Sequence, residues 1–455
     1  MTAVEELATG ELQALARRHL WMHFTRMGAY DEVHEIPVIV RGDGCYVYDQ
    51  HGRRYLDGLS ALYCVNIGHG RAEVAQAGAD QAKELGFFTN WGSAHPRAIE
   101  LAARIAGLAP GALNRVFFTS GGSEAVESAL KLCRQYHKLT GNPGRYKVIA
   151  RHLAYHGTTM GALSATGIPD ARRPFEPLFP GSAHVANTNQ YRPEAEDPAE
   201  AIRDRIEFEG PETVSCVILE PVQNSGGCLV APPGYFQRVR EICDEYGILF
   251  ISDEVICSWG RLGEYFGAER FGYEPDIITT AKGITSAYAA MGATIVSDRV
   301  FAPFAEGTAS FDHGLTFGGH PVASAVALAN IDVFERERLN EHVRANEGAF
   351  GAMLDGLRDI PIVGDVRGAG YFWALELVKD KATKATFSDA ESESLLRGHL
   401  SGELFGRGLI CRTDDRGDPV ITLAPPLIAG PEQFEEIRAV LRPVLEEASR
   451  RLELH

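Results

Sequence analysis

The 455-residue sequence lacks an excess of positive charge: 44 Lys and Arg residues stand against 61 Asp and Glu residues, a formal net charge of -17 at pH 7. Without a basic field, a protein cannot displace the counterions of a nucleic acid, so this composition argues against a nucleic-acid partner. The sequence also lacks apolar runs near the ~18 residues that a membrane span needs. We therefore expect no membrane segment and a small-molecule ligand.

Paired cysteines are also missing. The eight cysteines are scattered and form no Cys-x-x-Cys pair, which predicts reduced core thiols and no metal cluster. The first ten residues contain two glutamates and no basic apolar leader, so we expect no secretory signal. These features together predict a cytoplasmic protein.

The order of apolar segments predicts a mostly parallel α/β sheet. Between residues 72 and 331, apolar runs of strand length alternate with helix-length amphipathic segments, as in sheets buried on both faces. The runs are Arg115–Phe118, Val148–Ala150, Val214–Leu219, Ile248–Ser252 and Ile277–Ile278. The length itself favours two or three lobes.

The two ends of the chain predict a smaller α+β domain. We expect an amphipathic helix over Val4–His23 and two or three strands over Pro37–Leu56. After a long helix at Val322–Glu337, strands at Tyr371–Val378 and Val420–Thr422 precede a final helix from Pro431 to about Leu452. The predicted division is 1–70 as part of the small domain, 71–337 as the large domain, and 338–455 as the rest of the small domain.

A glycine-containing turn follows the first run of the predicted sheet. After Phe117 and Phe118, the residues Gly121, Gly122 and Ser123 bring bare backbone N–H groups and a hydroxyl to the start of a helix. Such a helix N-terminus is suited to a phosphate group. An ordinary turn with a serine cap is the alternative. The turn is neither a Walker loop nor a Gly-x-Gly-x-x-Gly fingerprint.

Two acids and one lysine lie where later strands end. Glu220 follows Val214–Leu219, Asp253 follows Ile248–Ser252, and Lys282 comes shortly after Ile277–Ile278. Ligands of open parallel sheets bind at this edge, although a helix cap or salt bridge would also explain either acid. A lysine withdrawn from water offers a free amine for carbonyl chemistry. Phosphate site, acid and amine together fit pyridoxal 5'-phosphate, by its phosphate, pyridine nitrogen and aldehyde.

Four short patterns in one order make a family resemblance specific: Ser120-Gly121-Gly122-Ser123-Glu124-Ala125, Tyr155-His156-Gly157, Asp253-Glu254-Val255 and Ala281-Lys282-Gly283. With them the sequence resembles the class III aminotransferases of fold type I, and among these the ω-transaminase or amine:pyruvate subgroup. The resemblance runs from about Trp21 to Leu441. It implies a large domain with a mostly parallel seven-stranded sheet, a smaller α+β domain from both termini, and an active site shared by two subunits of a homodimer.

The resemblance also implies residue roles. Lys282 matches the lysine that forms a Schiff base with pyridoxal 5'-phosphate and moves the proton during transamination. Asp253 matches the acid at the pyridine nitrogen, and Thr316 matches a threonine that reaches the phosphate bound by the neighbouring subunit. The other matches are Gly122 and Ser123 at the phosphate, Tyr155 and Val255 on the two ring faces, and Glu220 near the ring.

The resemblance also implies which residues bind the substrate. Arg412 matches an arginine that binds the acceptor carboxylate and swings away for other donors, with Arg416 as a competing candidate. Ser225 stands where ornithine, acetylornithine and γ-aminobutyrate enzymes carry a glutamate, which favours the amine:pyruvate subgroup. The resemblance also places aromatic residues in the substrate pocket: Tyr63, where several relatives have tryptophan, and Phe88 and Trp91, from the partner chain.

The sequence therefore predicts an aminotransferase that moves an amino group from a primary amine or ω-amino acid to a keto acid such as pyruvate, by a ping-pong mechanism. An aminomutase or a decarboxylase on the same fold is the first alternative, because the same lysine and aspartate serve each chemistry. A nicotinamide-dependent oxidoreductase is a remote one. It would need a Gly-x-Gly-x-x-Gly turn that the sequence lacks, and it would leave Lys282 unexplained.

Overall fold

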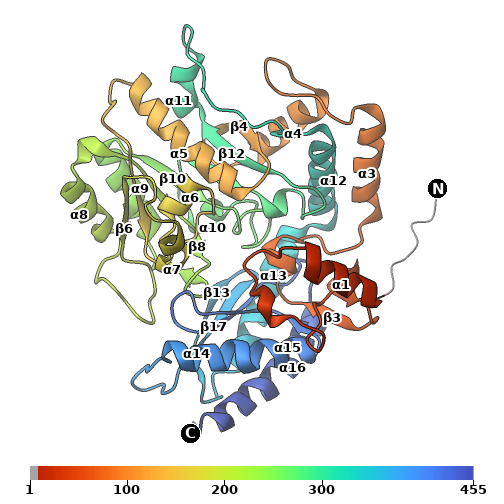
Figure 1. Cartoon of the computed structure of the whole chain (residues 1–455). Coiled ribbons are helices and arrows are strands. Elements are labelled where there is room, and N and C mark those ends of the chain that lie inside the picture. The colour runs from red at the N-terminus through yellow and green to blue at the C-terminus, as the bar shows by residue number, and fades with distance from the viewer. Residues whose placement is uncertain (1–8, 454–455) are drawn as a thin grey trace.

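The computed structural model of the chain describes residues 9–453. Its central feature is a seven-stranded sheet in the order β4-β12-β11-β10-β7-β5-β6, in which only β12 runs against its neighbours (Figure 1). The predicted mostly parallel sheet is confirmed. Its strands are β4 Leu113–Thr119, β5 Lys147–Arg151, β6 Ser182–Val185, β7 Val214–Leu219, β10 Leu249–Asp253, β11 Ile277–Thr280 and β12 Gly292–Ser297.

Helices cover both faces of this sheet because successive strand side chains point to opposite sides. In β7, Cys216 and Ile218 pack with helix α5 on one face, whereas Val217 and Leu219 pack with helices α8 and α9 on the other. All six residues of β7 are buried, which explains its continuous apolar sequence. The bounds are α5 Gly122–Leu139, α8 Glu200–Glu209 and α9 Tyr235–Tyr246.

The parallel strands end at one edge of the sheet and so collect the functional candidates there. Asp253 is the last residue of β10, Glu220 directly follows β7, and Lys282 comes two residues after β11. The Gly121–Ser123 turn follows β4 at the same edge, and Tyr155 lies in the loop after β5. Because the parallel strands all end at this edge, they bring together residues that span more than 150 positions of the chain.

Two smaller four-stranded sheets lie outside the central one, and the first combines strands from both ends of the chain. One has the order β1-β2-β3-β15 and pairs β3, near residue 55, in parallel with β15, near residue 410. The other, in the order β13-β14-β17-β16, is antiparallel throughout. Their strands are β1 Ile39–Asp43, β2 Tyr46–Asp49, β3 Arg54–Asp57, β13 Val363–Ala369, β14 Phe372–Leu377, β15 Leu409–Ile410, β16 Arg412–Asp414 and β17 Val420–Leu423.

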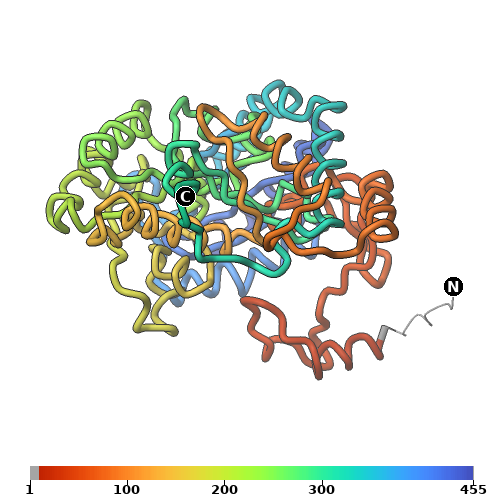
Figure 2. Tube along the Cα trace, turned by 90° about the horizontal axis from the view of Figure 1, so that it is seen from above, coloured from red at the N-terminus to blue at the C-terminus, as the bar shows by residue number. Residues whose placement is uncertain are grey.

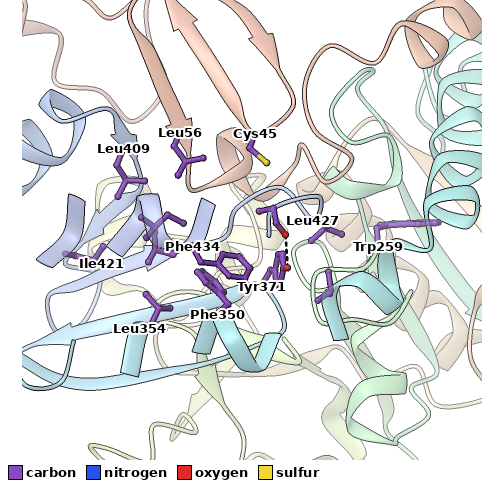
Figure 3. Packing of buried hydrophobic residues seen from close by; sticks show 14 of the residues in the cluster. Cys45, Leu56, Trp259, Phe350, Leu354, Tyr371, Leu409, Ile421, Leu427 and Phe434 are labelled. Carbon is purple, nitrogen blue, oxygen red and sulfur yellow. Dashed lines mark hydrogen bonds between the residues drawn. The ribbon is translucent and has the colours of Figure 1, made fainter. Parts of the chain in front are cut away.

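A large apolar core joins these small sheets to the C-terminal helices. Figure 3 shows Tyr371, Phe350 and Phe434 packed together, with Leu409 and Leu56 from the paired strands β15 and β3 nearby. The ring centres of Phe350 and Phe434 are 4.8 Å apart, and the Tyr371 hydroxyl donates to the Ala429 carbonyl at 2.9 Å. This core fixes the C-terminal strands against the N-terminal ones.

The remaining elements surround the sheets. They are the helices α1 Thr9–His19, α2 Ser60–Tyr63, α3 Ala72–Glu84, α4 Pro96–Leu108, α6 Met160–Ala165, α7 Pro169–Arg172, α10 Gly267–Phe271, α11 Asp298–Phe301, α12 Pro321–Glu337, α13 Leu339–Asp355, α14 Asp389–Leu395, α15 Ser401–Gly406 and α16 Pro431–Arg451, and the short strands β8 Val222–Gln223 and β9 Leu229–Val230. No helix in residues 9–453 is long and apolar enough to cross a membrane.

The predicted N-terminal helix is too long at its C-terminal end. The structure ends α1 at His19 rather than His23, and residues 4–8 of the prediction lie outside the described residues. Seen from above, this N-terminal segment projects away from the body of the molecule (Figure 2). Trp21 and Phe24 are more than four-fifths exposed there, so neither side chain packs against a core within the described residues.

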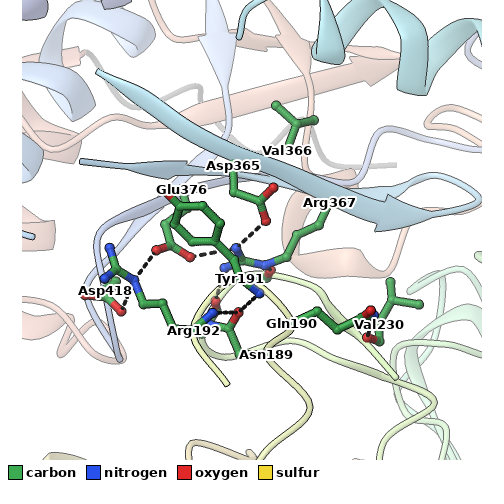
Figure 4. A network of polar contacts seen from close by, with 12 residues as sticks. Asn189, Gln190, Tyr191, Arg192, Val230, Asp365, Val366, Arg367, Glu376 and Asp418 are labelled. Atoms are coloured by element: carbon green, nitrogen blue, oxygen red, sulfur yellow. Dashed lines mark hydrogen bonds and ion pairs between the residues drawn. The ribbon is translucent and has the colours of Figure 1, made fainter. Parts of the chain in front are cut away.

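A group of buried charges connects the loop after β6 to the antiparallel sheet. Figure 4 shows Arg192 and Arg367 on either side of Glu376, at N–O distances of 2.5 and 2.6 Å. Arg367 also donates to the carbonyls of Gly226 and Gly227, each at 2.6 Å. We define the ionic cluster as three arginines and four acids: Arg192, Arg358, Arg367, Asp355, Asp365, Glu376 and Asp418.

Candidate functional site

One cavity of about 130 Å³ lies at the carboxyl edge of the central sheet. It collects seven of the eight residues that the sequence assigns to the cofactor, and Thr316 is the exception. The lining residues are Gly122, Ser123, Tyr155, His156, Gly157, Glu220, Asp253, Val255, Ile256, Cys257 and Lys282.

Asp253 is the most firmly held of the charged groups in this cavity. Its Oδ2 lies 2.7 Å from Nδ1 of the buried His156, and its Oδ1 accepts hydrogen bonds from the Thr279 hydroxyl at 3.1 Å and the Val255 N–H at 3.2 Å. Nε2 of His156 is buried and has no hydrogen-bond partner within the described chain. The carboxylate is therefore fixed in direction and able to hold a cationic N–H that enters the cavity.

The Gly122–Ser123 turn opens α5 with its N–H groups beside the cavity, as expected for a phosphate site. Ser123 Oγ accepts a hydrogen bond from the Thr158 N–H at 3.1 Å, which joins the turn to the loop after β5. Close packing leaves no room for a side chain at Gly122 or Gly157. A Cβ on Gly122 would lie 2.7 Å from Val255, and one on Gly157 would lie 2.6 Å from Ser123 Oγ.

Lys282 reaches the cavity from the other side. It is half-buried and makes no hydrogen bond or ion pair with any side chain among residues 9–453. The half-buried Lys147 and Lys379 differ, because each is paired with a glutamate at 2.8 Å. Lys282 also has a positive φ of 49°, an uncommon conformation for a non-glycine residue. Its amine is thus held at the cavity without a counter-ion.

Glu220 acts on the cavity through Tyr155. Its Oε1 accepts from the Tyr155 N–H at 3.2 Å, and its Oε2 accepts from the Asn224 N–H at 3.1 Å. Burial raises the pKa of this carboxyl, and the nearby charge of Asp253 adds to the increase. Glu220 therefore fastens the segment that carries Tyr155.

The two candidate arginines lie together beside Tyr155. Arg416 Nε is 2.9 Å from both carboxylate oxygens of Asp414, and Arg412 Nε is 3.2 Å from Asp414 Oδ2. The Arg416 guanidinium lies 5.7 Å from the centre of the Tyr155 ring. Burial raises the pKa of Tyr63 to about 12, with both arginines acting against that increase. Both arginines pair with Asp414, so the structure does not choose between the two candidates for the substrate carboxylate.

Besides Tyr63 and the two arginines, three predicted residues do not line the cavity. Thr316, Phe88 and Trp91 are exposed, the two aromatics by 51% and 63%. Trp91 instead lines a different, open cavity of about 730 Å³ together with Phe118 and Leu315. Exposed positions suit residues that act on a neighbouring subunit. That these residues do so stays a prediction.

Sequence reasoning assigned no role to three residues that contact the site. His156 stands inside the Tyr-His-Gly pattern, and its burial beside Asp253 was the missing information. Thr279 ends a buried strand, where a hydroxyl is a weak signal. Asp414 lies between the two candidate arginines, and this alternation of charge in the sequence was the available signal.

Comparison with known proteins gives one consistent family. The family described as aminotransferase class-III matches residues 28–445. A probable aminotransferase of Mycobacterium tuberculosis is 58% identical over 95% of this chain and 94% of its own length, and a putrescine–pyruvate aminotransferase of Pseudomonas aeruginosa is 38% identical over 97% of each chain.

Solved structures agree. An (S)-enantioselective omega-transaminase from Thermomicrobium roseum has a TM-score of 0.93 at 40% identity, covering 98% of this chain and 100% of its own. The omega transaminase of Pseudomonas jessenii in complex with PMP has a TM-score of 0.92 at 32% identity, covering 97% and 99%.

Proposed function

Because the chain belongs to the class III aminotransferases, which depend on pyridoxal 5'-phosphate, we propose that it moves an amino group from a primary amine or ω-amino acid to a keto acid such as pyruvate. The observation that carries the proposal is the arrangement of the cavity. A free lysine amine, a firmly held aspartate and an open helix N-terminus face one space of about 130 Å³. An aromatic ring and an aliphatic side chain, Tyr155 and Val255, line it as well.

The residues of the cavity fit this cofactor. The N–H groups of Gly122 and Ser123 would hold the phosphate at the start of α5, and Asp253 would hold the protonated pyridine nitrogen. Tyr155 and Val255 would contact the two ring faces. When bound, the cofactor supplies an electron-poor ring that stabilises negative charge on the substrate carbon.

The protein contributes positioning and proton transfer. We assign Lys282 Nζ as the group that would hold the cofactor aldehyde at rest. Once the donor amine replaces it there, the free Nζ would take a proton from the donor carbon and return it during transfer. Asp253 keeps the pyridine nitrogen charged, and His156 fixes the direction of its carboxylate at 2.7 Å. Glu220 is a positioning residue, because its hydrogen bond to the Tyr155 N–H fixes the backbone from which the aromatic ring extends.

The substrate class rests on the arginines and on two relatives. Arg412 and Arg416 would bind the acceptor carboxylate beside Tyr155, and buried Tyr63 would limit the donor side. The curated relatives include putrescine–pyruvate and taurine–pyruvate aminotransferases, which use pyruvate as acceptor and donors without an α-carboxylate. This supports an amine:pyruvate activity for the present chain.

An absorbance spectrum of the purified protein tests the proposal. Addition of 1-phenylethylamine should bleach the visible band of the bound cofactor, and pyruvate should restore it. A protein that responds to an amino acid but not to the amine would keep the family and contradict the amine:pyruvate assignment. Release of carbon dioxide without alanine would indicate a decarboxylase instead.

We also propose that the enzyme is a homodimer in which Thr316 completes the partner's site. Large apolar side chains are exposed in several places, among them Trp21 and Phe24 after α1, Phe88 and Trp91 in the loop before α4, and Phe317 next to Thr316. Exposed apolar groups of this size mark surfaces that another protein covers. A two-fold dimer would cover them and bring Thr316 to the other subunit.

Subunit mixing tests the shared site. Lys282→Ala and Thr316→Asp should each be poor enzymes, the second because its carboxylate repels the phosphate. If the site is shared, a mixed dimer carries one doubly mutated and one intact site. Mixing the two variants should then restore about a quarter of wild-type activity. Mixtures that stay as inactive as the separate variants would contradict the shared site, and sedimentation measures the dimer itself.

We further propose a two-domain division of the chain and a cytoplasmic location. The pairing of β3 with β15 supports a small domain built from 1–70 and 338–455 around a large domain of 71–337. All eight cysteines are free, six of them buried, which suits the reducing environment of the cytoplasm.

A further inference from the structure

Arg412 and Arg416 share a single counter-ion. Asp414 is the only acid in residues 9–453 within ion-pair distance of either guanidinium. Two positive charges against one negative charge leave an excess of one positive charge. Although burial acts to raise the pKa of Asp414, the hydrogen bonds and charges of the arginines outweigh it and lower that pKa. The carboxylate is therefore ionised and fully engaged.

This three-residue group lies beside the cavity. Asp414 is 7% exposed, and Arg416 lies over Tyr155, which lines the cavity. The loop that follows packs on the Tyr155 segment as well, since a Cβ on Gly417 would lie 3.0 Å from Leu153. Arg412 stands where the chain passes from the β1–β2–β3–β15 sheet to the antiparallel sheet, and its side chain keeps 30% exposure. The Arg416 side chain keeps 21% exposure, so both cations are partly open to solvent.

Asp414 offers the arginines the same chemical group that a keto acid would bring. A guanidinium pairs best with a carboxylate through parallel N–H bonds, and a buried charge without a partner is costly. A substrate carboxylate entering beside Tyr155 must therefore compete with Asp414 for one arginine. A substrate without a carboxylate needs no such exchange, because Asp414 already neutralises part of the charge.

We propose that Asp414 is an internal counter-ion that sets how strongly the site prefers carboxylate-bearing substrates over uncharged ones. It yields one arginine to a substrate carboxylate and holds both when the substrate has none. The proposal rests on the proposed function and adds to it a specificity-determining residue that acts through Arg412 and Arg416.

The test compares charged and uncharged acceptors. For Asp414→Asn, kcat/KM for pyruvate relative to propanal, with one amine donor, should rise roughly three- to tenfold because the arginines lose their internal competitor. The dissociation constant of propionate, a non-reacting carboxylate, should fall by a similar factor in calorimetry. Arg416→Gln should do the opposite, because Asp414 then pairs with Arg412 alone.

Asp415→Asn is the matched control. Its carboxylate is adjacent in sequence but pairs with Arg397 at 2.6 Å on the surface, so both readouts should stay unchanged. A folded Asp414→Asn with unaltered acceptor ratio and propionate affinity would overturn the proposal. If Asp414→Asn does not fold, Arg416→Gln decides, and an unchanged propionate affinity there overturns it too. Failure of the wild type to use pyruvate would instead contradict the proposed function, and propionate binding would still test Asp414.

Discussion

The ionic cluster around Glu376 and the group of Arg412, Asp414 and Arg416 are both partly buried sets of charges, yet they differ in balance. The ionic cluster has three arginines and four acids. Its fully buried Glu376 receives two guanidinium groups (Figure 4). The other group has two arginines for one acid. Each arginine of the ionic cluster is paired with at least one acid of its own cluster. Arg412 and Arg416 share one acid, and we expect their unmatched positive charge to bind an anion.

The difference teaches how to separate structural charges from functional ones. Arg367 also uses its guanidinium on the Gly226 and Gly227 carbonyls, so none of its charge faces a ligand. Lys282 has no partner at all within the described residues, and Arg412 has one shared partner. Incomplete pairing at a cavity, rather than burial, marks the groups that we expect to touch a ligand.

The largest expected effect comes from the unpaired amine. Lys282→Ala should lower the transamination rate by about 10³-fold or more, because the group that takes and returns the proton is lost. The apparent melting temperature of the cofactor-free protein should change little, since Lys282 forms no ion pair in residues 9–453. Rate assays and calorimetry measure the two quantities. A variant that loses stability along with activity would show that Lys282 also stabilises the fold, and would contradict the separation of functional from structural charges.

The opposite pattern is expected in the ionic cluster. Glu376→Gln should lower the free energy of unfolding by about 3 kcal/mol, because two half-buried guanidinium groups lose the fully buried carboxylate that they share. The activity of the molecules that remain folded should be kept. Denaturant unfolding measures the loss. Glu391→Gln, which breaks an exposed pair with Lys379, serves as the control and should cost less than about 1 kcal/mol.

The last effect is a change of stability with pH and concerns an acid without any cation. Glu254 has no ion-pair partner in the described residues; burial raises its pKa to about 8, against hydrogen bonds from Gly267, Ala268 and Ser252. The folded state therefore binds this proton more tightly than the unfolded chain, and the stability contribution falls as the pH rises from about 4.5 to about 8.

Glu254→Gln removes that dependence. Relative to wild type, the variant should gain stability as the pH rises through this window, with a slope of up to about 1.4 kcal/mol per pH unit. Denaturant unfolding at pH 5, 6.5 and 8 measures the difference. A constant difference between variant and wild type at all three pH values would show that Glu254 does not titrate there.

Much of the fold and of the cavity could be predicted from the sequence. The strand at Val214–Leu219 has its predicted bounds, and α12 differs by one residue from the predicted helix, because buried strands and long helices carry strong apolar patterns. Gly122, Asp253 and Lys282 were found because each follows a strand, and parallel strands end at one edge. The end of α1 was missed because no core stabilises the residues after His19, as the exposure of Trp21 shows, and the sequence alone does not report this.

By itself, the sequence determined the class of fold, the family and most of the residues that line the cavity, because these depend on local patterns in a fixed order along the chain. Only the tertiary structure decided which charges are matched. His156 meets Asp253 across 97 positions, and the ionic cluster joins residues 192 and 376. It also placed both arginines on Asp414 beside Tyr155. Ion pairing falls off over a few ångströms, so it depends on distances that chain order does not specify.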